Sequence, residues 1–209
     1  MGAHPTGVVT FLFTDIEGST RLWERHPHDM RDALVMHDGI LRNGFERHDG
    51  YVFGVLGDGF AAAFAAPIDA ITSAIEIQST LRATAWPHGE EMRVRIAIDT
   101  GIADERDDEY YGSALNRLGR VIKLIDGGTS VITSTTASIV RDELDGGIEL
   151  NTHTTVQVRD MDEPVEILEI SVGGEQSPPG ARPQRSFHAL LGEVERLVDD
   201  AVGHGEADG

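Results

Sequence analysis

The sequence predicts an α+β fold in which helices pack on a single mixed sheet. Strand-like and helix-like patterns alternate over residues 7–171, and hairpin signals separate some of the strands. Of the 209 residues, 40% are hydrophobic and 25% are charged, an ordinary composition for a domain with a core. We therefore expect one domain over residues 7–171, preceded by a short extension over residues 1–6.

The first strand is predicted over residues 8–13, a continuous β-branched and aromatic run that is typical of a strand buried on both faces. A helix follows, and Ser19 or Thr20 can cap its N-terminus. Its apolar residues recur at helical spacing as far as residues 49–50, where Asp-Gly ends it. Pro27 predicts a bend or a restart near the beginning of this helix.

Residues 51–66 are predicted to form two short strands, because Gly-Asp-Gly at residues 57–59 between apolar runs is a strong hairpin signal. Pro67 opens a second helix at a position that proline tolerates, and Trp-Pro at residues 86–87 ends it. Apolar residues at alternate positions from residue 92 to residue 98 then predict a half-buried strand.

Further elements are predicted in the second half of the chain from apolar periodicity and flanking glycines. The acidic stretch over residues 104–109 is expected to be a solvated loop or a hairpin tip. The elements that follow it are a helix over 113–125, a strand at 131–132, a short helix over 134–144 and a closing hairpin of strands 154–158 and 165–170.

The composition changes after residue 171. Residues 172–186 are rich in Gly, Ser and Pro and are predicted to be a flexible linker. Residues 187–202 carry an amphipathic stripe and predict a C-terminal helix, followed by a tail over residues 203–209. This helix is expected to pack on the domain or on a dimer partner, or else to contact another protein.

The charge excludes several classes of function. Lys and Arg number 17 against 36 Asp and Glu, for a net charge of −19, which argues against binding nucleic acid or an anionic membrane surface. A polyanionic ligand would have to arrive with a cation. There is no cysteine, no signal-peptide layout and no apolar run of membrane-spanning length, so we expect a cytoplasmic protein. The nine histidines show no metal-ligand spacing and are expected at the surface, among them His26, His28, His37, His48 and His88.

A pair of carboxylates is the first candidate for chemistry. Asp15 follows the first strand, and Asp58 lies at the tip of the predicted hairpin. If the two strands are neighbours, both carboxylates converge and can bind Mg²⁺ or Mn²⁺, which water and substrate phosphates then complete. The backbone N–H groups of residues 16–20 lie at a helix N-terminus, where an anion can bind. The alternative is that Asp58 is only a turn residue and Asp15 only a helix cap.

A second candidate lies on the predicted helix over residues 113–125. Asn116 and Arg120 are four residues apart and therefore share one face of that helix. An amide and a guanidinium on one face can hold a ribose and a phosphate. The alternative is an exposed helix face with a surface arginine.

Three motifs together resemble a known family. They are VTFLFTDIEGST at residues 9–20, GDGF at residues 57–60, and YGSALNRLGR at residues 111–120. In this order and spacing they resemble the class III nucleotidyl cyclases, most of all the bacterial, mycobacterial-type adenylate/guanylate cyclase domain. The resemblance covers residues 7–171 and implies a ferredoxin-like core that works as a head-to-tail homodimer with sites shared across the interface.

The resemblance also implies roles for individual residues. Asp15 and Asp58 would hold two divalent cations, Mg²⁺ or Mn²⁺, with help from the carbonyl of Ile16. The cations would activate the ribose 3′-hydroxyl of ATP or GTP for in-line attack on the α-phosphorus, with pyrophosphate leaving. Asn116 of the other chain would orient the ribose, and Arg120 would stabilise charge on the α-phosphate. The phosphate-binding positions would be Glu17, Gly18, Ser19, Thr20 and Arg159.

The positions that read the base depart from the family pattern. Gly54 stands where an adenine-selecting Lys is usual, and Glu109 stands where Asp or Thr is usual. One hypothesis is therefore a working cyclase, favouring ATP but with poor purine selectivity. The other is a degenerate cyclase that acts as a nucleotide-binding or protein-binding regulatory module, and other metal-dependent nucleotide chemistry on the same fold also stays open.

Overall fold

The structure is a computed structural model that describes residues 4–106, 109–144, 147–157 and 164–173. The chain divides into two compact units, Met1–Gly173 and Gly174–Gly209, and the description below concerns the first. The predicted C-terminal helix over residues 187–202 and its tail lie outside the described residues, as do Arg159 and nearly all of the predicted linker.

Helices and strands alternate in the order that the sequence predicts. The helices are α1 (Ser19–Arg25), α2 (Asp29–Arg47), α3 (Pro67–Ala83), α4 (Ser113–Val121), the 3₁₀ turn η1 (Ile122–Leu124) and α5 (Ser134–Val140). The strands are β1 (Gly7–Ile16), β2 (Tyr51–Leu56), β3 (Gly59–Phe64), β4 (Val94–Arg106), β5 (Glu109–Tyr111), β6 (Ser130–Thr133), β7 (Ile148–Val156) and β8 (Val165–Val172). Among the described residues, none of these helices is long and apolar enough to cross a bilayer.

The strands form one mixed sheet with the order β2-β3-β1-β4-β6-β8-β7, and β5 pairs with β4. The first four strands and the helices between them make a βαββαβ unit of the ferredoxin-like type, whose strand order is β2-β3-β1-β4. Strand β6 pairs with β4 in parallel, which makes the sheet mixed. The predicted fold class is thus confirmed.

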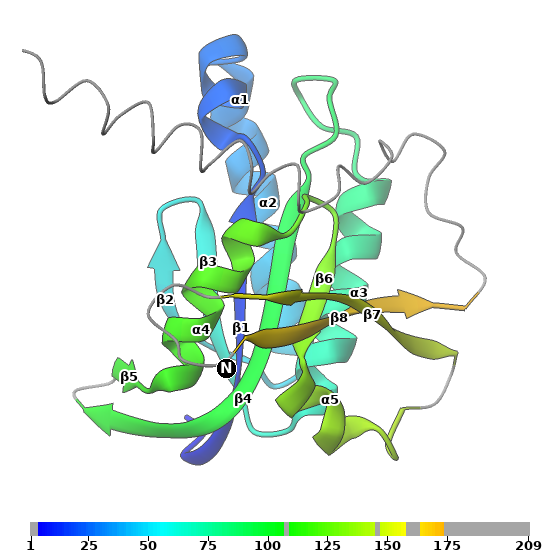
Figure 1. Cartoon of the computed structure of the whole chain (residues 1–209). Coiled ribbons are helices and arrows are strands. Elements are labelled where there is room, and N and C mark those ends of the chain that lie inside the picture. The colour runs from blue at the N-terminus through cyan, green and yellow to red at the C-terminus, as the bar shows by residue number, and fades with distance from the viewer. Residues whose placement is uncertain (1–3, 107–108, 145–146, 158–163, 174–209) are drawn as a thin grey trace, which may run out of the picture. The chain divides into compact units, whose positions relative to one another are not determined.

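Helices cover both faces of the sheet. Figure 1 shows α4 in front of the strands and α2 and α3 behind them. Alternate residues of β4 face the two sides: Ile96 and Ile98 join the core under α2 and α3, whereas Gly101 lies against Ala114 of α4. On the α4 side the aromatic rings of Phe11, Phe53 and Tyr110 pack edge to face.

The local signals predicted most elements, and tertiary packing changed some bounds. The helix after β1 is divided at Pro27, and the β2–β3 hairpin forms around residues 57–58, as predicted. The prediction of a half-buried strand starting at residue 92 is wrong: β4 starts at Val94, reaches Arg106, and is buried on both faces in its centre, because strands flank it and helices cover it. Likewise α4 ends at Val121 rather than at residue 125, and β7 starts at Ile148 rather than at residue 154.

The prediction that the histidines lie at the surface needs correction, and the expected N-terminal extension contacts the domain. His37 is fully buried and His88 is nearly so, and neither is a surface residue, because α2 packs on the core and residue 88 lies in a loop beside Trp86. The expected N-terminal extension is partly ordered by the domain: the Tyr110 hydroxyl donates to the Pro5 carbonyl at 2.7 Å, and the His4 ring packs on Tyr51.

Candidate active site

Asp15 and Asp58 are brought together by the pairing of β1 with β3. Asp15 is the next-to-last residue of β1, and Asp58 lies in the turn that leads into β3. Phe13 pairs with Ala61, and the same antiparallel register leads to Gly59 opposite Asp15. The Phe60 N–H donates to Thr14 Oγ1 at 2.8 Å, and a Cβ added at Gly59 would overlap the Thr14 carbonyl oxygen. The turn that carries Asp58 therefore lies directly against the end of β1.

The carboxylate of Asp58 is incompletely satisfied. Its Oδ2 is buried and has no hydrogen-bond partner among the described residues. Buried polar atoms are normally paired, because an unpaired one forfeits the interactions that it had with water. An orphaned carboxylate oxygen beside a second carboxylate fits a cation site.

Asp15 is neutralised by an arginine of the neighbouring strand. Arg95 on β4 donates from Nη1 to Asp15 Oδ2 at 2.9 Å, and its Nη2 lies 3.6 Å from Glu17 Oε1. Arg93 lies 3.3 Å from Glu17 Oε2 and completes a cluster of two arginines and two carboxylates. Hence Arg95 holds the Asp15 carboxylate in place, and a cation can bind to the same carboxylate.

The donor set of this site suits Mg²⁺ or Mn²⁺. Two carboxylates and the nearby Ile16 carbonyl are hard oxygen donors, which these cations prefer. Within the described part of the chain, no group of three or more His, Cys, Asp or Glu side chains could hold a metal. The remaining positions would be filled by water and by substrate phosphates, as is usual for Mg²⁺.

The turn between β1 and α1 differs from its prediction. Gly18 is the N-cap of α1, with φ 66°, and neither Ser19 nor Thr20 caps the helix with its side chain. Ser/Thr capping was wrong because glycine takes this left-handed conformation without steric cost, which moves the helix start to Ser19. The side chain of Glu17 accepts from the Gly127 N–H at 3.1 Å and pairs with Arg93. The Glu17 N–H donates to the Arg93 carbonyl at 2.9 Å, so neither the side chain nor the backbone N–H of Glu17 is placed to bind an anion, and its predicted phosphate-binding role needs correction.

Asn116 and Arg120 lie on α4, away from its buried stripe of Ala114, Leu118 and Val121. Asn116 is exposed, and Arg120 is half-buried. Among the described residues, no hydrogen bond joins the Asn116 side chain to Asp15 or Asp58 of the same chain. The structure thus presents Asn116 at the surface of α4.

Gly54 and Glu109, the two positions predicted to read the base, are brought to one region by their neighbours in the chain. Gly54 lies on β2 beside a β-bulge, and Glu109 opens β5. Phe53, which precedes Gly54, and Tyr110, which follows Glu109, pack ring against ring with centroids 5.0 Å apart. A Cβ added at Gly54 would meet the Cβ of Ala61 at 3.6 Å, an ordinary contact, so a side chain is sterically admissible there.

Glu109 has a partner within its own strand. Its Oε2 accepts from the hydroxyl of Tyr111 at 2.6 Å. This hydrogen bond and the charge of Glu109 raise the pKa of Tyr111. Glu109 therefore presents an exposed carboxylate whose orientation Tyr111 restrains.

Sequence reasoning missed a buried ion pair between β4 and α4. Asp99 is fully buried, and its Oδ2 accepts from Arg117 Nε at 2.7 Å. The available signal was an aspartate inside the apolar run of β4, which requires a partner. The sequence alone does not name that partner, because only the docking of α4 brings Arg117 to it.

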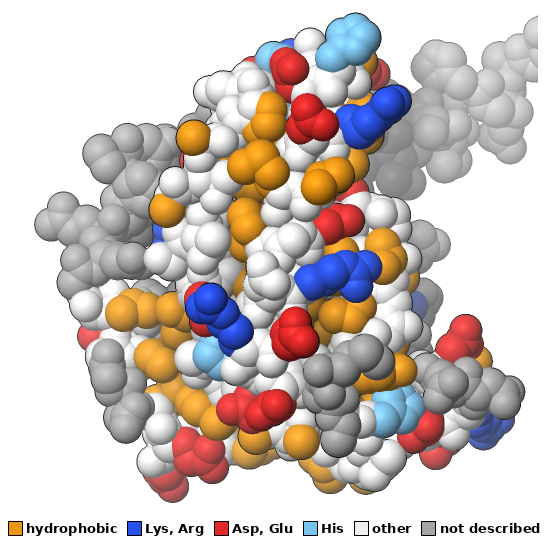
Figure 2. Space-filling model, turned by 180° about the vertical axis from the view of Figure 1, so that it is seen from behind, with side chains coloured by type: hydrophobic (Ala, Val, Ile, Leu, Met, Phe, Trp, Pro, Cys, Tyr) orange, Lys and Arg blue, Asp and Glu red, His pale blue; other side chains and the backbone are white. Residues whose placement is uncertain are grey.

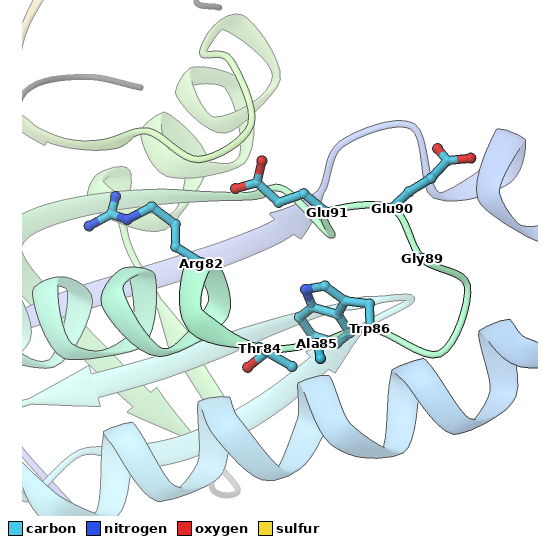
Figure 3. A pocket seen from close by; sticks show the side chains of 7 residues that line it. All are labelled: Arg82, Thr84, Ala85, Trp86, Gly89, Glu90 and Glu91. Atoms are coloured by element: carbon cyan, nitrogen blue, oxygen red, sulfur yellow. The ribbon is translucent and has the colours of Figure 1, made fainter. Parts of the chain in front are cut away.

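One described hollow lies elsewhere. It has a volume of about 420 Å³ and lies between the end of α3 and the start of β4, as Figure 3 shows. Its lining residues are Arg82, Thr84, Ala85, Trp86, Gly89, Glu90 and Glu91. None of them is a predicted site residue. On the face seen in Figure 2, acidic, basic and hydrophobic side chains are interspersed, so charge alone does not mark a site there.

Comparisons with known proteins identify the family of the chain. A family model described as the adenylate and guanylate cyclase catalytic domain matches residues 1–167. An uncharacterized protein of Mycobacterium tuberculosis is 36% identical over 142 residues, which are 67% of this chain and 47% of that protein. The receptor-type adenylate cyclase GRESAG 4.3 of Trypanosoma brucei brucei is 28% identical over 238 residues, covering 94% of this chain and 19% of its own. The chain thus spans about half the length, or less, of these curated relatives.

A solved structure of adenylate cyclases from Trypanosoma brucei, described as being in their monomeric state, is similar over most of the domain. It has a TM-score of 0.72 and 25% identity, and the match covers 84% of this chain and 93% of that one. The fold and the resemblance predicted from the motifs are therefore confirmed.

Proposed function

The chain belongs to the adenylate and guanylate cyclase catalytic domain family, and on this premise we propose that it converts ATP, or GTP, to the 3′,5′-cyclic nucleotide and pyrophosphate. One observation carries the proposal: Asp58 keeps a buried, unpartnered carboxylate oxygen at the turn that packs against the Asp15 end of β1. Unpartnered buried charge is costly unless a ligand completes it. A cation that arrives with a triphosphate would complete it.

Asp15, Asp58 and the Ile16 carbonyl would hold the cations, two Mg²⁺ or Mn²⁺ for each site. When bound, the cations would supply charge neutralisation and lower the pKa of the ribose 3′-hydroxyl. Arg95 donates to Asp15 and also lies beside Glu17, so its guanidinium would stay near the site if a cation shared the Asp15 oxygen. Arg95 thereby orients Asp15 before substrate binds.

The phosphates would be bound by backbone N–H groups at the start of α1, over residues 18–20, with Arg159 as a further cationic group. The first N–H groups of a helix have no partner within the helix and point toward an anion. The left-handed turn at Gly18 exposes them. The side chain of Glu17 stays with Arg93, away from the triphosphate.

Asn116 and Arg120 would act on the site of a second copy of the chain, in a head-to-tail homodimer. The exposure of Asn116 supports this assignment, because an amide that orients a ribose must be reachable from outside its own subunit. Val8 and Ile102, which face each other across the β1–β4 pair, are 61% and 76% exposed and provide apolar surface for self-association. Sedimentation velocity tests the dimer, since the trypanosome relatives are described as monomeric.

Base selection would rest on the region around Gly54 and Glu109. The Glu109 carboxylate can accept from the exocyclic amine of adenine, or from N1 and N2 of guanine. Gly54 contributes no polar group, so we expect ATP to be favoured with weak discrimination against GTP. The reaction is expected in the cytoplasm, where these nucleotides are available.

The second candidate function is a regulatory module that binds nucleotide or a protein partner without turnover. Gly54 favours it, because an enzyme under demand for purine selectivity would keep a polar side chain at that position. The C-terminal residues 187–202 are a proposed contact segment for such a partner. Removal of residues 172–209 would separate the two roles of the tail: a changed dimerisation constant assigns it to self-association, and an unchanged constant excludes that role.

The proposal is tested by incubation of the purified protein with Mn²⁺ or Mg²⁺ and either ATP or GTP, with cyclic nucleotide measured. We expect product from the native protein and a fall of at least about 100-fold in Asp15→Asn and Asp58→Asn. Asp104→Asn is the matched control, because that carboxylate is 76% exposed and lies far along β4. Product at equal rates in all variants, or in none, contradicts the proposal, and nucleotide binding without product supports the regulatory module.

A further inference from the structure

Asp99 lies at the centre of β4, and both of its carboxylate oxygens accept hydrogen bonds. Its Oδ2 accepts from Arg117 Nε at 2.7 Å, and its Oδ1 accepts from Thr133 Oγ1 at 2.6 Å and from the Thr100 N–H at 2.9 Å. The carboxylate has no exposed surface, and 19% of the Arg117 side chain is exposed. Such an arrangement is a fully satisfied buried ion pair rather than an open site.

The network extends from Asp99 into two further elements. Thr133 is the N-cap of α5, where its Oγ1 accepts from the Thr136 N–H at 3.3 Å. Thr136 donates in turn to Thr100 at 3.1 Å, and Thr100 shares a hydrogen bond with Thr10 of β1 at 3.0 Å. Asp99 is therefore anchored to β1, β4 and α5 together, and Arg117 of α4 bonds directly to it.

Ala114, Leu118 and Val121 give α4 small, apolar contacts with the sheet. Ala114 approaches Gly101, where an added Cβ would lie only 3.1 Å from the Ala114 Cβ, and Leu118 and Val121 are buried. Apolar burial is not directional, so these contacts hold the helix against the sheet without fixing its rotation. A hydrogen bond from a guanidinium is directional and does fix it.

We propose that Asp99 and Arg117 are positioning residues, which set the rotation of α4 and so present Asn116 and Arg120 to the nucleotide. Arg117 is adjacent to Asn116 and one helical turn before Arg120, so a rotation of α4 at Arg117 moves both side chains. The roles of Asn116 and Arg120 rest on the proposed function, whereas the restraint on α4 does not.

The electrostatics agree with a positioning role. Burial raises the pKa of Asp99, and the hydrogen bonds from Thr133 and Arg117 oppose that rise. A buried ion pair costs desolvation that apolar residues of the same size would avoid, so it is a poor device for stability alone. Its advantage is a defined geometry.

The first experiment measures amide hydrogen exchange in the intact protein and needs no activity. In Asp99→Asn, exchange over residues 113–121 should accelerate at least about tenfold more than exchange over α3. Arg117→Lys keeps the charge but loses the Nε geometry, and should act in the same direction with less risk of unfolding. Asp104→Asn on the same strand is the control. Unchanged exchange in α4, or equal acceleration in α3 and α4, overturns the proposal.

The second experiment uses heterodimers with one working site. One chain carries Asp58→Ala and supplies an intact α4, and the other carries Asn116→Ala and supplies intact carboxylates. Asp99→Asn is then added to either chain. On the chain that supplies the working α4, kcat should fall at least about tenfold while KM changes less than about twofold, because Arg120 acts on charge that develops in the transition state. On the other chain, activity should stay within about twofold of the parent pair.

The outcomes separate this inference from the proposed function. An equal loss on either chain means a general defect of folding and overturns the positioning role, as does the absence of any loss. A native protein that makes no cyclic nucleotide contradicts the proposed function alone, and the exchange of α4 amides then decides the positioning role by itself.

Discussion

Two acidic residues, one within the sheet and one in a turn between its strands, differ in what surrounds their buried oxygens. Asp99, in the middle of β4, receives hydrogen bonds on both oxygens from Arg117, Thr133 and the Thr100 backbone. Asp58, at the β2–β3 turn, keeps a buried oxygen without a partner among the described residues. The satisfied carboxylate serves the fold, and the unsatisfied one marks the place where a ligand is expected. In this chain, incomplete hydrogen bonding points to function more clearly than burial does.

The largest expected contrast is in the stability of the metal-free protein. Asp99→Asn should lower the free energy of unfolding by about 3 kcal/mol, because it leaves Arg117 without its counter-charge. Asp58→Asn should leave stability unchanged or raise it, because it removes a charge that has no partner. Urea unfolding with a chelator present measures both. A larger loss in Asp58→Asn than in Asp99→Asn would reverse the comparison.

The next contrast is the stabilisation that a ligand gives. At a free concentration of 100 times the dissociation constant, Mn²⁺ with a triphosphate should stabilise the native protein by about 2.7 kcal/mol. The gain should vanish on chelation and be absent in Asp58→Asn. Asp99→Asn should still be stabilised by the ligand, although its free energy of unfolding without ligand is lower. Thermal unfolding with and without EDTA measures it. Equal gains in native protein and Asp58→Asn would mean that the cation binds elsewhere.

A smaller effect is expected at the base-reading positions. Gly54→Lys together with Glu109→Asp should raise the preference for ATP over GTP by about tenfold, since a hydrogen-bonding group would then reject the wrong base. The site has space for the lysine, because the Cβ position at Gly54 meets only Ala61. The ratio of kcat/KM for the two purines is the measurement. An unchanged ratio would show that selectivity lies outside this region.

The smallest effect concerns His88. Like Asp58 Oδ2, its Nε2 is buried and has no hydrogen-bond partner among the described residues. Burial, followed by the charge of His26, lowers the pKa of His88 below 6.5, and Glu90 opposes this. The unfolded chain then binds a proton that the folded one does not, so stability is present above pH 6.5 and falls as the pH drops through the folded pKa. His88→Asn should flatten this part of the unfolding profile, and exposed His28→Asn should not. Equal slopes in both variants would refute the assignment.

The sequence predicted those parts of the fold that depend on local signals. The division of the helix at Pro27, the hairpin around Gly57-Asp58-Gly59 and the helix start at Pro67 follow from turn and helix chemistry within a few residues. The full length and burial of β4 depend instead on β1 and β6, which flank it from distant parts of the chain. The left-handed N-cap at Gly18 was missed because Ser and Thr are the usual caps.

The sequence predicted which residues form the candidate site, but not which residues form hydrogen bonds and ion pairs with them. Asp15 and Asp58 were expected to converge if their strands were neighbours, and the β1–β3 pairing provides that neighbourhood. The guanidinium on Asp15 comes from Arg95, 80 positions away in sequence, and could not be read from the motif. Arg117 was overlooked beside Asn116, since only the docking of α4 onto β4 reveals its role. The roles of Asn116, Arg120, Gly54 and Glu109 stay predictions.

The central claim is that Asp15 and Asp58 jointly bind the cations that accompany a nucleoside triphosphate. A crystal of the protein grown with Mn²⁺ and a non-cyclisable ATP analogue, with anomalous diffraction recorded at the manganese edge, tests it most directly. We predict anomalous peaks between the two carboxylates, bridged to the phosphates, with Arg95 displaced from Asp15. Nucleotide bound with manganese at another place, or with Asp58 still lacking any partner, would contradict the claim.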